Sequence, residues 1–425
     1  MWLATRMSAL GRVVVEAIVH EYGCDELLRR LAHPFWFQSF GAVMGMDWHS
    51  SGITTSVIGA LKRGLQPVQR ELGLYVCGGR GSHSRRTPDE LLSFGEQTGV
   101  DAGDLVRASR LVAKIDSAAV QDGYHLYLHA FFVTQEGKWC VVQQGMNEAR
   151  REARRYHWQS ENLPGFFASP HSAIEGRNAG SIVNLADARA SRSREAALTL
   201  VQAGPEETVS FVRRYGLGPG PQGCPPPLQG SLALAPDDGS SLQPHLQLPH
   251  RHEVRASDVM LRRLHATLAA ASERCPREFS ELLLAKGVGA RTVAALAFVA
   301  EVVHGAPSRF SDPARYSLAY GGKDGHPFPV PLKVYDETIR VLKSAVARAK
   351  LGRDDMLCAL KQLDAQARAL EGQVSGPGFD AFLAAERAQS ASYGGRSVAG
   401  FSKEPPPARS SVCRPSPSAQ QRLRL

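Results

Sequence analysis

The spacing of apolar residues predicts the first elements of the chain. Over residues 7–31 apolar side chains recur three and four positions apart, which is the period of one helix face, and Gly23 divides the run. We therefore expect two short helices there. Residues 72–78, Leu-Gly-Leu-Tyr-Val-Cys-Gly, predict a buried strand. Thr87 and Pro88 then predict a helix start, with threonine as the N-cap and proline at the first helical position.

The clearest strand pattern follows. Residues 124–133 and 138–144 are rich in aromatic and β-branched side chains, and a short Gly-bearing connection over 134–137 separates them. This pattern predicts an antiparallel hairpin. Because helices and strands are mixed without regular alternation, we expect an α+β fold for residues 1–200.

The remainder of the chain predicts a different organisation. Residues 201–250 contain a stretch rich in proline and glycine and are expected to form a linker. Residues 251–372 have helical periodicity and are expected to form an all-helical domain. Residues 373–425 are rich in serine, proline, arginine and glycine, which is typical of a disordered basic tail.

The charge of the chain favours an anionic partner. Its formal net charge is +9 and its pI is near 9.3, and such a surface attracts nucleic acid or anionic lipid. The seven cysteines form no CxxC pair, which argues against a disulfide framework and a cysteine zinc site. No apolar run has the length of a bilayer span. We expect a cytoplasmic, nucleoid-associated protein without a membrane contact.

The strongest motif lies at residues 278–300, where a leucine-bearing helix, a Gly-Val-Gly turn and an alanine-rich helix follow one another. The pattern resembles the helix-hairpin-helix of DNA repair proteins. Gly287 and Gly289 permit backbone angles closed to other residues, and Val288 anchors the turn in the core. The second helix then presents unpaired N–H groups, which form an anion site suited to a phosphate.

The residues around this turn agree with phosphate binding. Lys286 and Arg291 flank it, and the Thr292 hydroxyl can donate to the same phosphate. Such contacts would be independent of base sequence. The alternative is an ordinary glycine turn between two packed helices.

The N-terminal region carries candidate chemistry at Asp47 and His49, in the segment Asp-Trp-His-Ser-Ser-Gly. One interpretation is metal ligation or general-base catalysis. The other is a polar turn whose side chains cap a helix over residues 53–64.

A second cluster precedes and enters the predicted hairpin. Asp116 and Asp122 lie before the first strand, and His125, Tyr127 and His129 are expected on one of its faces because side chains alternate. With Gln143 and Gln144 on the partner strand, they could hold Mg²⁺ or Mn²⁺ to activate water against a phosphodiester. The candidate catalytic residues are thus Asp47, His49, Asp116, Asp122 and His125, and the candidate metal ligands are Asp47, His49 and Asp116. Structural hydrogen bonding is the alternative.

Two further segments could contact a nucleic-acid backbone. Residues 77–86 combine glycines with three arginines, including Arg80 and Arg85, which suits a phosphate-binding loop. Residues 148–157 carry four arginines on an expected helix, including Arg154 and Arg155. Solvated basic surfaces are the alternative for both segments.

Several longer stretches together carry a resemblance to a known family. They lie at residues 25–31, 34–38, 45–52, 114–124, 141–146, 153–158 and 321–327. As a set they are similar to one uncharacterised prokaryotic family, domain of unknown function family 763. The similarity covers roughly residues 2–371, and the family implies organisation but no activity. Its members begin upstream of the equivalent of Trp2 with an extended segment, so the resemblance leads us to expect a strand ahead of this sequence.

These observations support three functions. The first is a DNA repair or processing nuclease that uses a divalent metal, and the second is a DNA-structure-binding adaptor without catalysis. The third is a base-excision glycosylase, for which Asp312 follows the hairpin at roughly the required distance. That aspartate could instead cap a helix beginning at Pro313. Convergence of the acidic and histidine residues would favour an enzyme, and dispersal would favour a binder.

Overall fold

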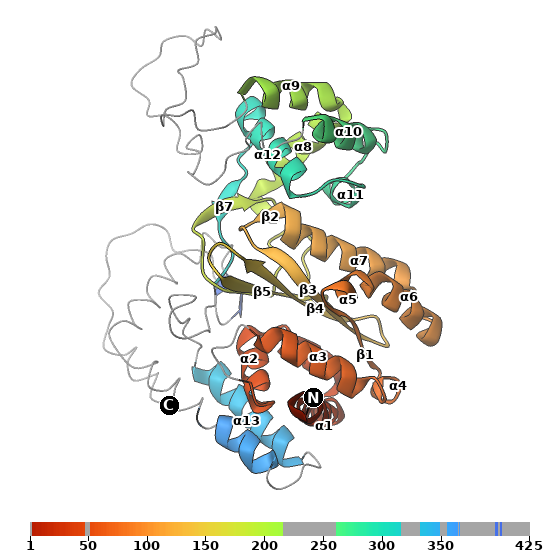
Figure 1. Cartoon of the computed structure of the whole chain (residues 1–425), viewed down its shortest axis with the longest axis vertical. Coiled ribbons are helices and arrows are strands. Elements are labelled where there is room, and N and C mark those ends of the chain that lie inside the picture. Colours follow the sequence, from red (N-terminus) through yellow and green to blue (C-terminus); the bar gives the residue numbers. More distant parts are fainter. Residues whose placement is uncertain are drawn as a thin grey trace, which may run out of the picture.

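The computed structural model of the protein describes residues 2–46, 52–215, 261–315, 332–348, 355–363, 365, 396–397 and 400–401. Over these residues the protein is a mixture of helices and antiparallel sheets. Figure 1 shows a helical group at one end, a sheet with helices on both faces in the middle, and further helices at the other end.

The central sheet has five strands in the order β1-β3-β4-β5-β6, all neighbours antiparallel. The strands are β1 (Leu74–Arg80), β3 (His125–Thr134), β4 (Trp139–Asn147), β5 (Glu152–Gln159) and β6 (Ala173–Glu175). The predicted hairpin is confirmed as β3 and β4, with Phe131 opposite Val141, and the strand predicted at residues 72–78 is confirmed as β1. A bulge between Leu126 and Leu128 interrupts the alternation of β3.

The layer on one face of this sheet begins with the N-terminal helix. It contains α1 (Trp2–Leu31), α2 (Pro34–Val43), α3 (Ile53–Leu65), the short α4 (Gln69–Leu72) and α13 (Leu332–Arg348). Gly23 has φ of +84° and divides α1 into the two helices that its sequence predicts. Alternate residues of the central strands, such as Phe132 and Val142, join these helices in one apolar core.

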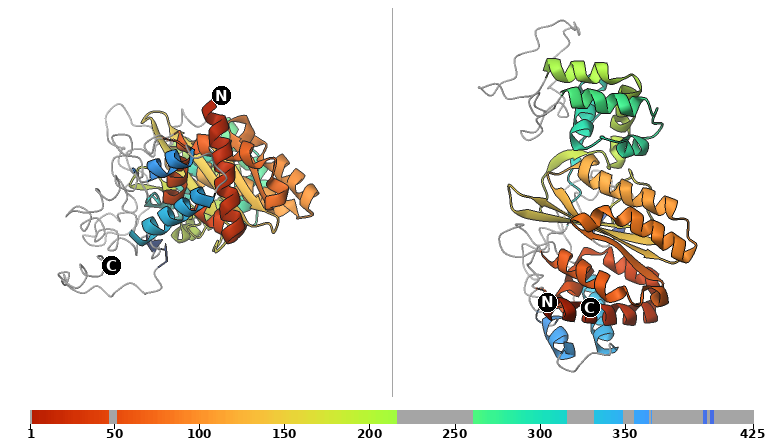
Figure 2. Two further views of the ribbon diagram at one scale, coloured as in Figure 1. Left: turned by 90° about the horizontal axis from the view of Figure 1, so that it is seen from below. Right: turned by 45° about the vertical axis from the view of Figure 1, so that its right-hand side comes forward.

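The helices on the opposite face are α5 (Ser82–Arg85), α6 (Thr87–Thr98) and α7 (Ala102–Lys114), and α7 continues into the π-helix η1 (Ile115–Ala119). The two layers enclose the sheet in the right-hand view of Figure 2. The helix predicted at Thr87 is confirmed, although Thr87 is its first residue and Arg86 is the N-cap. The Thr87 hydroxyl donates to the Ser84 carbonyl at 2.8 Å, so it does not cap an amide of α6.

A second, smaller sheet connects this body to the helical group. Its strands β2 (Val120–Gln121), β7 (Ser181–Asn184) and β8 (Arg309–Ser311) pair in the order β2-β7-β8. The 3-10 turn η2 (Ala188–Ala190) then leads into α8 (Ser191–Gln202), α9 (Pro205–Tyr215), α10 (Leu261–Ser272), α11 (Phe279–Leu284) and α12 (Ala290–His304), which pack together.

The helical group differs from the predicted domain boundaries. It begins at α8, and α9 occupies the start of the segment expected to be a linker. Helix α13 packs against α1 and α2 and not against α10–α12. Most of the predicted tail at 373–425 lies outside the described residues; the two-residue strands β9 (Arg396–Ser397) and β10 (Gly400–Phe401) pair within it.

The helix predicted over residues 148–157 is wrong, because residues 152–159 form the strand β5. Its side chains alternate between the two faces. Arg154, Tyr156 and Trp158 face α7 and η1, whereas Arg155 and His157 face α1–α3. Arg154 and Arg155, which were expected to contact a nucleic-acid backbone from a helix, belong instead to a strand buried on both faces.

Candidate functional site

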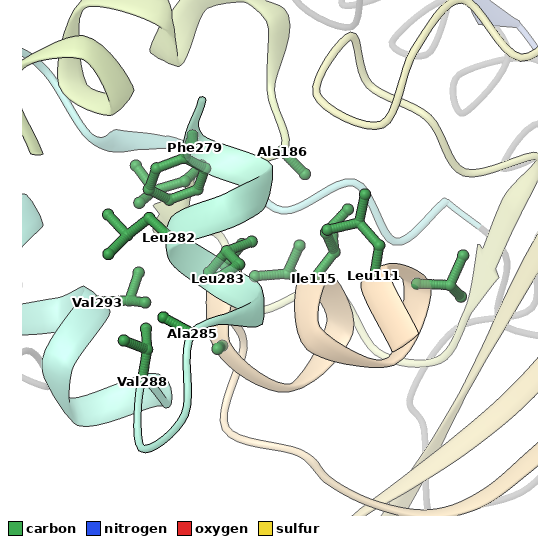
Figure 3. Packing of buried hydrophobic residues seen from close by; sticks show 14 of the residues in the cluster. Leu111, Ile115, Ala186, Phe279, Leu282, Leu283, Ala285, Val288 and Val293 are labelled. Carbon is green, nitrogen blue, oxygen red and sulfur yellow. The ribbon is translucent and has the colours of Figure 1, made fainter. Parts of the chain in front are cut away.

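The turn between α11 and α12 is built around two buried apolar residues. Gly287 has φ of +90°, a left-handed conformation that favours glycine, and Val288 is 1% exposed. Figure 3 shows Ala285 and Val288 beside Val293 on the inner side of the turn, while Leu283 points toward Ile115. The turn is therefore held by the core beneath it.

Polar contacts tie this turn to the sheet-bearing body. The Lys114 ammonium donates to the Val288 carbonyl, and the Gln121 amide donates to the Ala290 carbonyl at 2.9 Å. Burial lowers the pKa of Lys114 below its ordinary value. Because Lys114 ends α7, these contacts fix the start of α12 relative to that helix.

The outer side of the turn is basic. Lys286 and Arg291 are exposed on either side of it, and no side chain caps the start of α12. Thr292 is 7% exposed in the first helical turn. Gly289 has extended backbone and open space where a Cβ would stand. An anion reaching the first amides of α12 would meet no side chain of Gly289.

Helix α7 adds a row of cations beside the turn, which sequence reasoning missed. Arg107, Arg110 and Lys114 are spaced by three and four residues and so share one face of α7. Arg107 donates to the Ser280 hydroxyl of α11 at 3.2 Å, and Lys114 contacts the turn, so this face borders both elements. The row spans about 10 Å at the rise of an α-helix. We call Arg107, Arg110, Lys114, Lys286 and Arg291 the basic surface.

Asp116 lies in a buried network within the sheet-bearing body. Its carboxylate accepts from Gln143 at 2.5 Å and from Trp158 at 2.8 Å, and it lies 2.5 Å from His171 Nε2. Gln143 Oε1 in turn lies 2.8 Å from His129 Nδ1. With its oxygens on three partners, Asp116 is 0% exposed.

His129 is the other end of this network. Because Gln143 donates its amide group to Asp116, its oxygen accepts from His129 Nδ1, and His129 Nε2 accepts from the Ser109 hydroxyl at 2.9 Å. Burial lowers the pKa of His129, so the imidazole is neutral at pH 7. The Ser109–His129 pair is buried under α7 and is 2% and 6% exposed.

Asp122 belongs to a separate ion network centred on Arg154. Arg154 donates to Asp122 at 2.8 Å and to Asp312 at 2.7 and 3.1 Å. Asp122 also accepts from the Tyr156 hydroxyl at 2.7 Å, and Asp312 accepts from the backbone amide of Ala179 at 2.7 Å. This network connects the central sheet to the segment that leaves β8.

The expectation that His125, Tyr127 and His129 share a face of β3 is wrong. The bulge between Leu126 and Leu128 places Tyr127 against the core of α1–α3, where its hydroxyl donates to Gln144 at 2.7 Å. His125 is exposed at the start of β3, whereas His129 is buried. Asp116 and His129 thus share one buried network through Gln143, whereas Asp122 belongs to another network and His125 is exposed.

Arg155 and His157 form a third network on the α1–α3 face. Arg155 donates to Gln38 at 2.9 Å and to His157 Nε2 at 2.9 Å, and His157 Nδ1 lies 2.9 Å from the Leu31 carbonyl. Burial and the nearby guanidinium hold the pKa of His157 well below its usual range. Arg154 and Arg155 are 0% and 1% exposed, so neither offers a guanidinium to a nucleic-acid backbone.

The glycine-rich segment after β1 forms a tight corner. A Cβ on Gly78 would lie 2.3 Å from the His129 carbonyl oxygen and 2.4 Å from the Thr87 hydroxyl oxygen, so only glycine fits this close approach. Arg80 and Arg85 are exposed, as a phosphate-binding loop requires. The Gly78 amide, however, donates to Glu90 and is not available to an anion.

Asp47 and His49 lie outside the described residues. The helix expected after them is confirmed as α3, whose N-cap is Gly52 without a side-chain cap. Across the ranges that the structure describes, no group of three or more histidine, cysteine, aspartate or glutamate residues could hold a metal ion. Asp312 is 0% exposed and bonded to Arg154, and it accepts from the Ala314 amide at 2.9 Å. Residues 313–315 are not helical, so the helix expected to begin at Pro313 is not formed there.

Comparisons with known proteins identify one family. No curated protein and no solved structure matches the chain. Among the described helices, none is both long and apolar enough to cross a membrane. The model of the family described as Protein of unknown function (DUF763) matches residues 1–330, more than three quarters of the 425 residues. The chain therefore belongs to the protein-of-unknown-function family DUF763.

Proposed function

We propose that the protein binds DNA through the basic surface, with the α11–α12 turn acting as a helix-hairpin-helix. The observation that carries this proposal is the position of the turn. An uncapped start of α12 lies between exposed Lys286 and Arg291 and beside the cationic face of α7. Two elements far apart in the sequence thus direct positive charge to one place.

The chemistry of this surface suits a phosphodiester backbone. A phosphate can accept from the first amides of α12, where the helix dipole favours negative charge, while flanking side chains neutralise its neighbours. Along a duplex axis the row on α7 would span about three phosphates of one strand. Since neither feature reads base edges, we expect binding to be independent of sequence.

Among the three functions considered, the adaptor without catalysis has the most support. Asp116 has its carboxylate oxygens bonded to protein groups, and Asp122 is neutralised by Arg154. Asp116 has one histidine neighbour, His171, but the described ranges contain no group of three or more acidic, histidine or cysteine residues that could hold a metal ion. The glycosylase proposal loses support, because Asp312 is committed to Arg154 and to backbone amides. A DNA partner also implies a cytoplasmic location at the nucleoid.

The test is titration of labelled single-stranded, duplex and branched DNA, followed by fluorescence anisotropy at several salt concentrations. We expect the Lys286→Ala/Arg291→Ala variant to lose affinity for all three and to lower the slope of log K against log salt by about 2. The matched control is Arg63→Ala/Arg70→Ala, which removes the same charge from exposed positions on α3 and α4. An equal loss of DNA affinity in both variants would refute a specific binding surface, because the net charge of the protein would then account for the binding.

The same DNA substrates separate binding from cutting. With Mg²⁺ or Mn²⁺ present we expect bound DNA to stay intact. Cleavage that disappears in Asp47→Ala or Asp116→Ala, with folding unchanged, would replace the adaptor by the metal-dependent nuclease. Intact DNA with binding lost in the Lys286→Ala/Arg291→Ala variant would support the adaptor.

A further inference from the structure

The open edge of β1 borders a pocket that the proposed function does not use. The pocket measures about 490 Å³, within the range of ligand sites, and is lined by β1, by the α3–α4 region and by α6. In Figure 1, β1 lies at the margin of the central sheet, between α3 on one side and α6 on the other. Among the strands that the structure describes, β1 pairs with β3 alone, and its second edge faces this pocket.

The direction of the backbone groups along β1 follows from its neighbours. The Gly73 carbonyl accepts from the Gln135 amide at 3.0 Å, and the Gly81 amide donates to the Tyr127 carbonyl at 2.8 Å, so odd-numbered residues face β3. The register is continuous from Leu74 to Arg80, and residues directly opposite alternate between bonded and non-bonded pairs. The even-numbered residues of β1 therefore direct both N–H and C=O to the open edge.

Gly78 confirms this direction and shows how one end of the edge is closed. Its amide donates to Glu90 at 2.7 Å, and its carbonyl accepts from the Lys62 ammonium at 2.6 Å. Lys62 and Glu90 are themselves an ion pair, 2.7 Å apart. At Val76, one step along the edge, no described residue accepts from the amide or donates to the carbonyl. A donor and an acceptor thus lie side by side on the floor of the pocket.

The pocket is lined by apolar and polar side chains, and it has no net charge because its charged residues balance. Gln66 and Gln69 line one side, and Ser93 and Gln97 line the other. Lys62 and Glu90 form an ion pair, and the other two charged residues of the lining, Arg86 and Asp89, carry opposite charges. Amide and hydroxyl side chains can donate to or accept from a neutral polar partner, but they do not offer a full charge to a phosphate.

We propose that this edge binds a short extended peptide with uncharged polar side chains, which adds as a strand beside Val76. A peptide backbone supplies the acceptor and donor that the Val76 N–H and C=O require, and strand addition to an exposed edge is an established mode of recognition. Alternate peptide side chains would meet the glutamine and serine walls. The lining carries as many acidic as basic side chains, with Asp89 and Glu90 beside Lys62 and Arg86, and this balance favours a peptide over a nucleic acid.

The probe is a pool of acetylated, amidated tetrapeptides built from glutamine, asparagine, serine and threonine, added to the full chain. Binding is measured by calorimetry and by hydrogen exchange at the Val76 amide, which we expect to slow about tenfold in the complex. Val76→Pro removes the outward donor and leaves the bonds to β3 in place, because only an odd-numbered residue donates to that strand. Ser93→Trp fills the pocket from an exposed position of α6.

The matched control is Glu96→Trp, an exposed position on α6 that is not part of the pocket lining. We expect Val76→Pro and Ser93→Trp to weaken binding about tenfold or more and Glu96→Trp to leave it unchanged. The Ser93 variant keeps the test valid if Val76→Pro does not fold. The proposal is overturned if no peptide of the pool binds, if Ser93→Trp binds as wild type does, or if an oligonucleotide alone protects the Val76 amide.

Discussion

Replacing Arg154 with methionine should lower the free energy of unfolding by about 3–5 kcal/mol, the usual result of removing one member of a buried ion pair. The arginine is 0% exposed, and its guanidinium lies within 2.8 Å of Asp122 and 2.7 Å of Asp312. Methionine preserves much of the side-chain volume. It leaves two carboxylates near one another in the interior without a counter-charge.

The pH dependence of this loss identifies its cause. Burial raises the pKa of Asp122 even though Arg154 lowers it, so without Arg154 that pKa should rise further above its value in the unfolded chain. A folded-state pKa that is raised contributes stability at low pH and loses it as pH rises through the folded value. Urea unfolding followed by circular dichroism should therefore show a larger difference from wild type at pH 8 than at pH 5.

Arg177→Met provides the control for this experiment. Arg177 pairs with Glu152 at 3.2 Å, but its side chain is 57% exposed, so its loss should change the free energy of unfolding by about 0.5 kcal/mol or less. A cost below about 1 kcal/mol for Arg154→Met, equal at both pH values, would refute the view that its charge balances the two aspartates.

Three further outcomes follow from single positions. Burial lowers the pKa of His33 to about 4, and its Nδ1 accepts from the first turn of α2, so the unfolded chain binds more protons between pH 6.5 and pH 4. As pH is lowered from 6.5 to 4, the free energy of unfolding should fall by about 3 kcal/mol. Urea titrations should show a smaller fall in His33→Asn, because asparagine can cap the helix but does not titrate. Gly287→Ala should cost about 1–2 kcal/mol because φ is +90°, whereas thermal unfolding of Gly289→Ala should match wild type, since its Cβ enters open space. Burial raises the pKa of the Cys77 thiol to about 12, so alkylation at pH 8 followed by mass spectrometry should label exposed Cys275 first; equal rates would contradict this burial.

Local patterns predicted the elements that depend on near neighbours. The break at Gly23, the strand β1, the hairpin of β3 and β4 and the helix α3 all follow from periodicity and turn residues within a short window. The glycine turn before α12 is local in the same sense. Its positive φ at Gly287 and the buried Val288 need only a few adjacent residues.

The errors have long-range causes. Strand β5 carries arginines on both faces, which hydropathy cannot distinguish from a solvated helix, because the groups that neutralise Arg154 include Asp312, 158 positions away. The bulge after Leu126 moves Tyr127 to the other face of β3 without a sequence signal that alternation detects. The sequence shows that the cations of α7 are spaced to share one helix face. It does not show that this face lies beside α11, which only the tertiary contact of Arg107 with Ser280 reveals.

That row gives the most direct test of whether α7 and the turn act as one surface. Arg110 is exposed, so Arg110→Gln should lower the salt slope of DNA binding by about 1 and leave thermal unfolding unchanged. Lys114 also donates to the Val288 carbonyl, so Lys114→Met should lower the slope and destabilise the turn, visible as faster hydrogen exchange at the start of α12. If Arg110→Gln binds DNA with an unchanged slope while Lys286→Ala does not, phosphates reach the turn without touching α7. The DNA-binding surface would then consist of the start of α12 and its two flanking cations, Lys286 and Arg291.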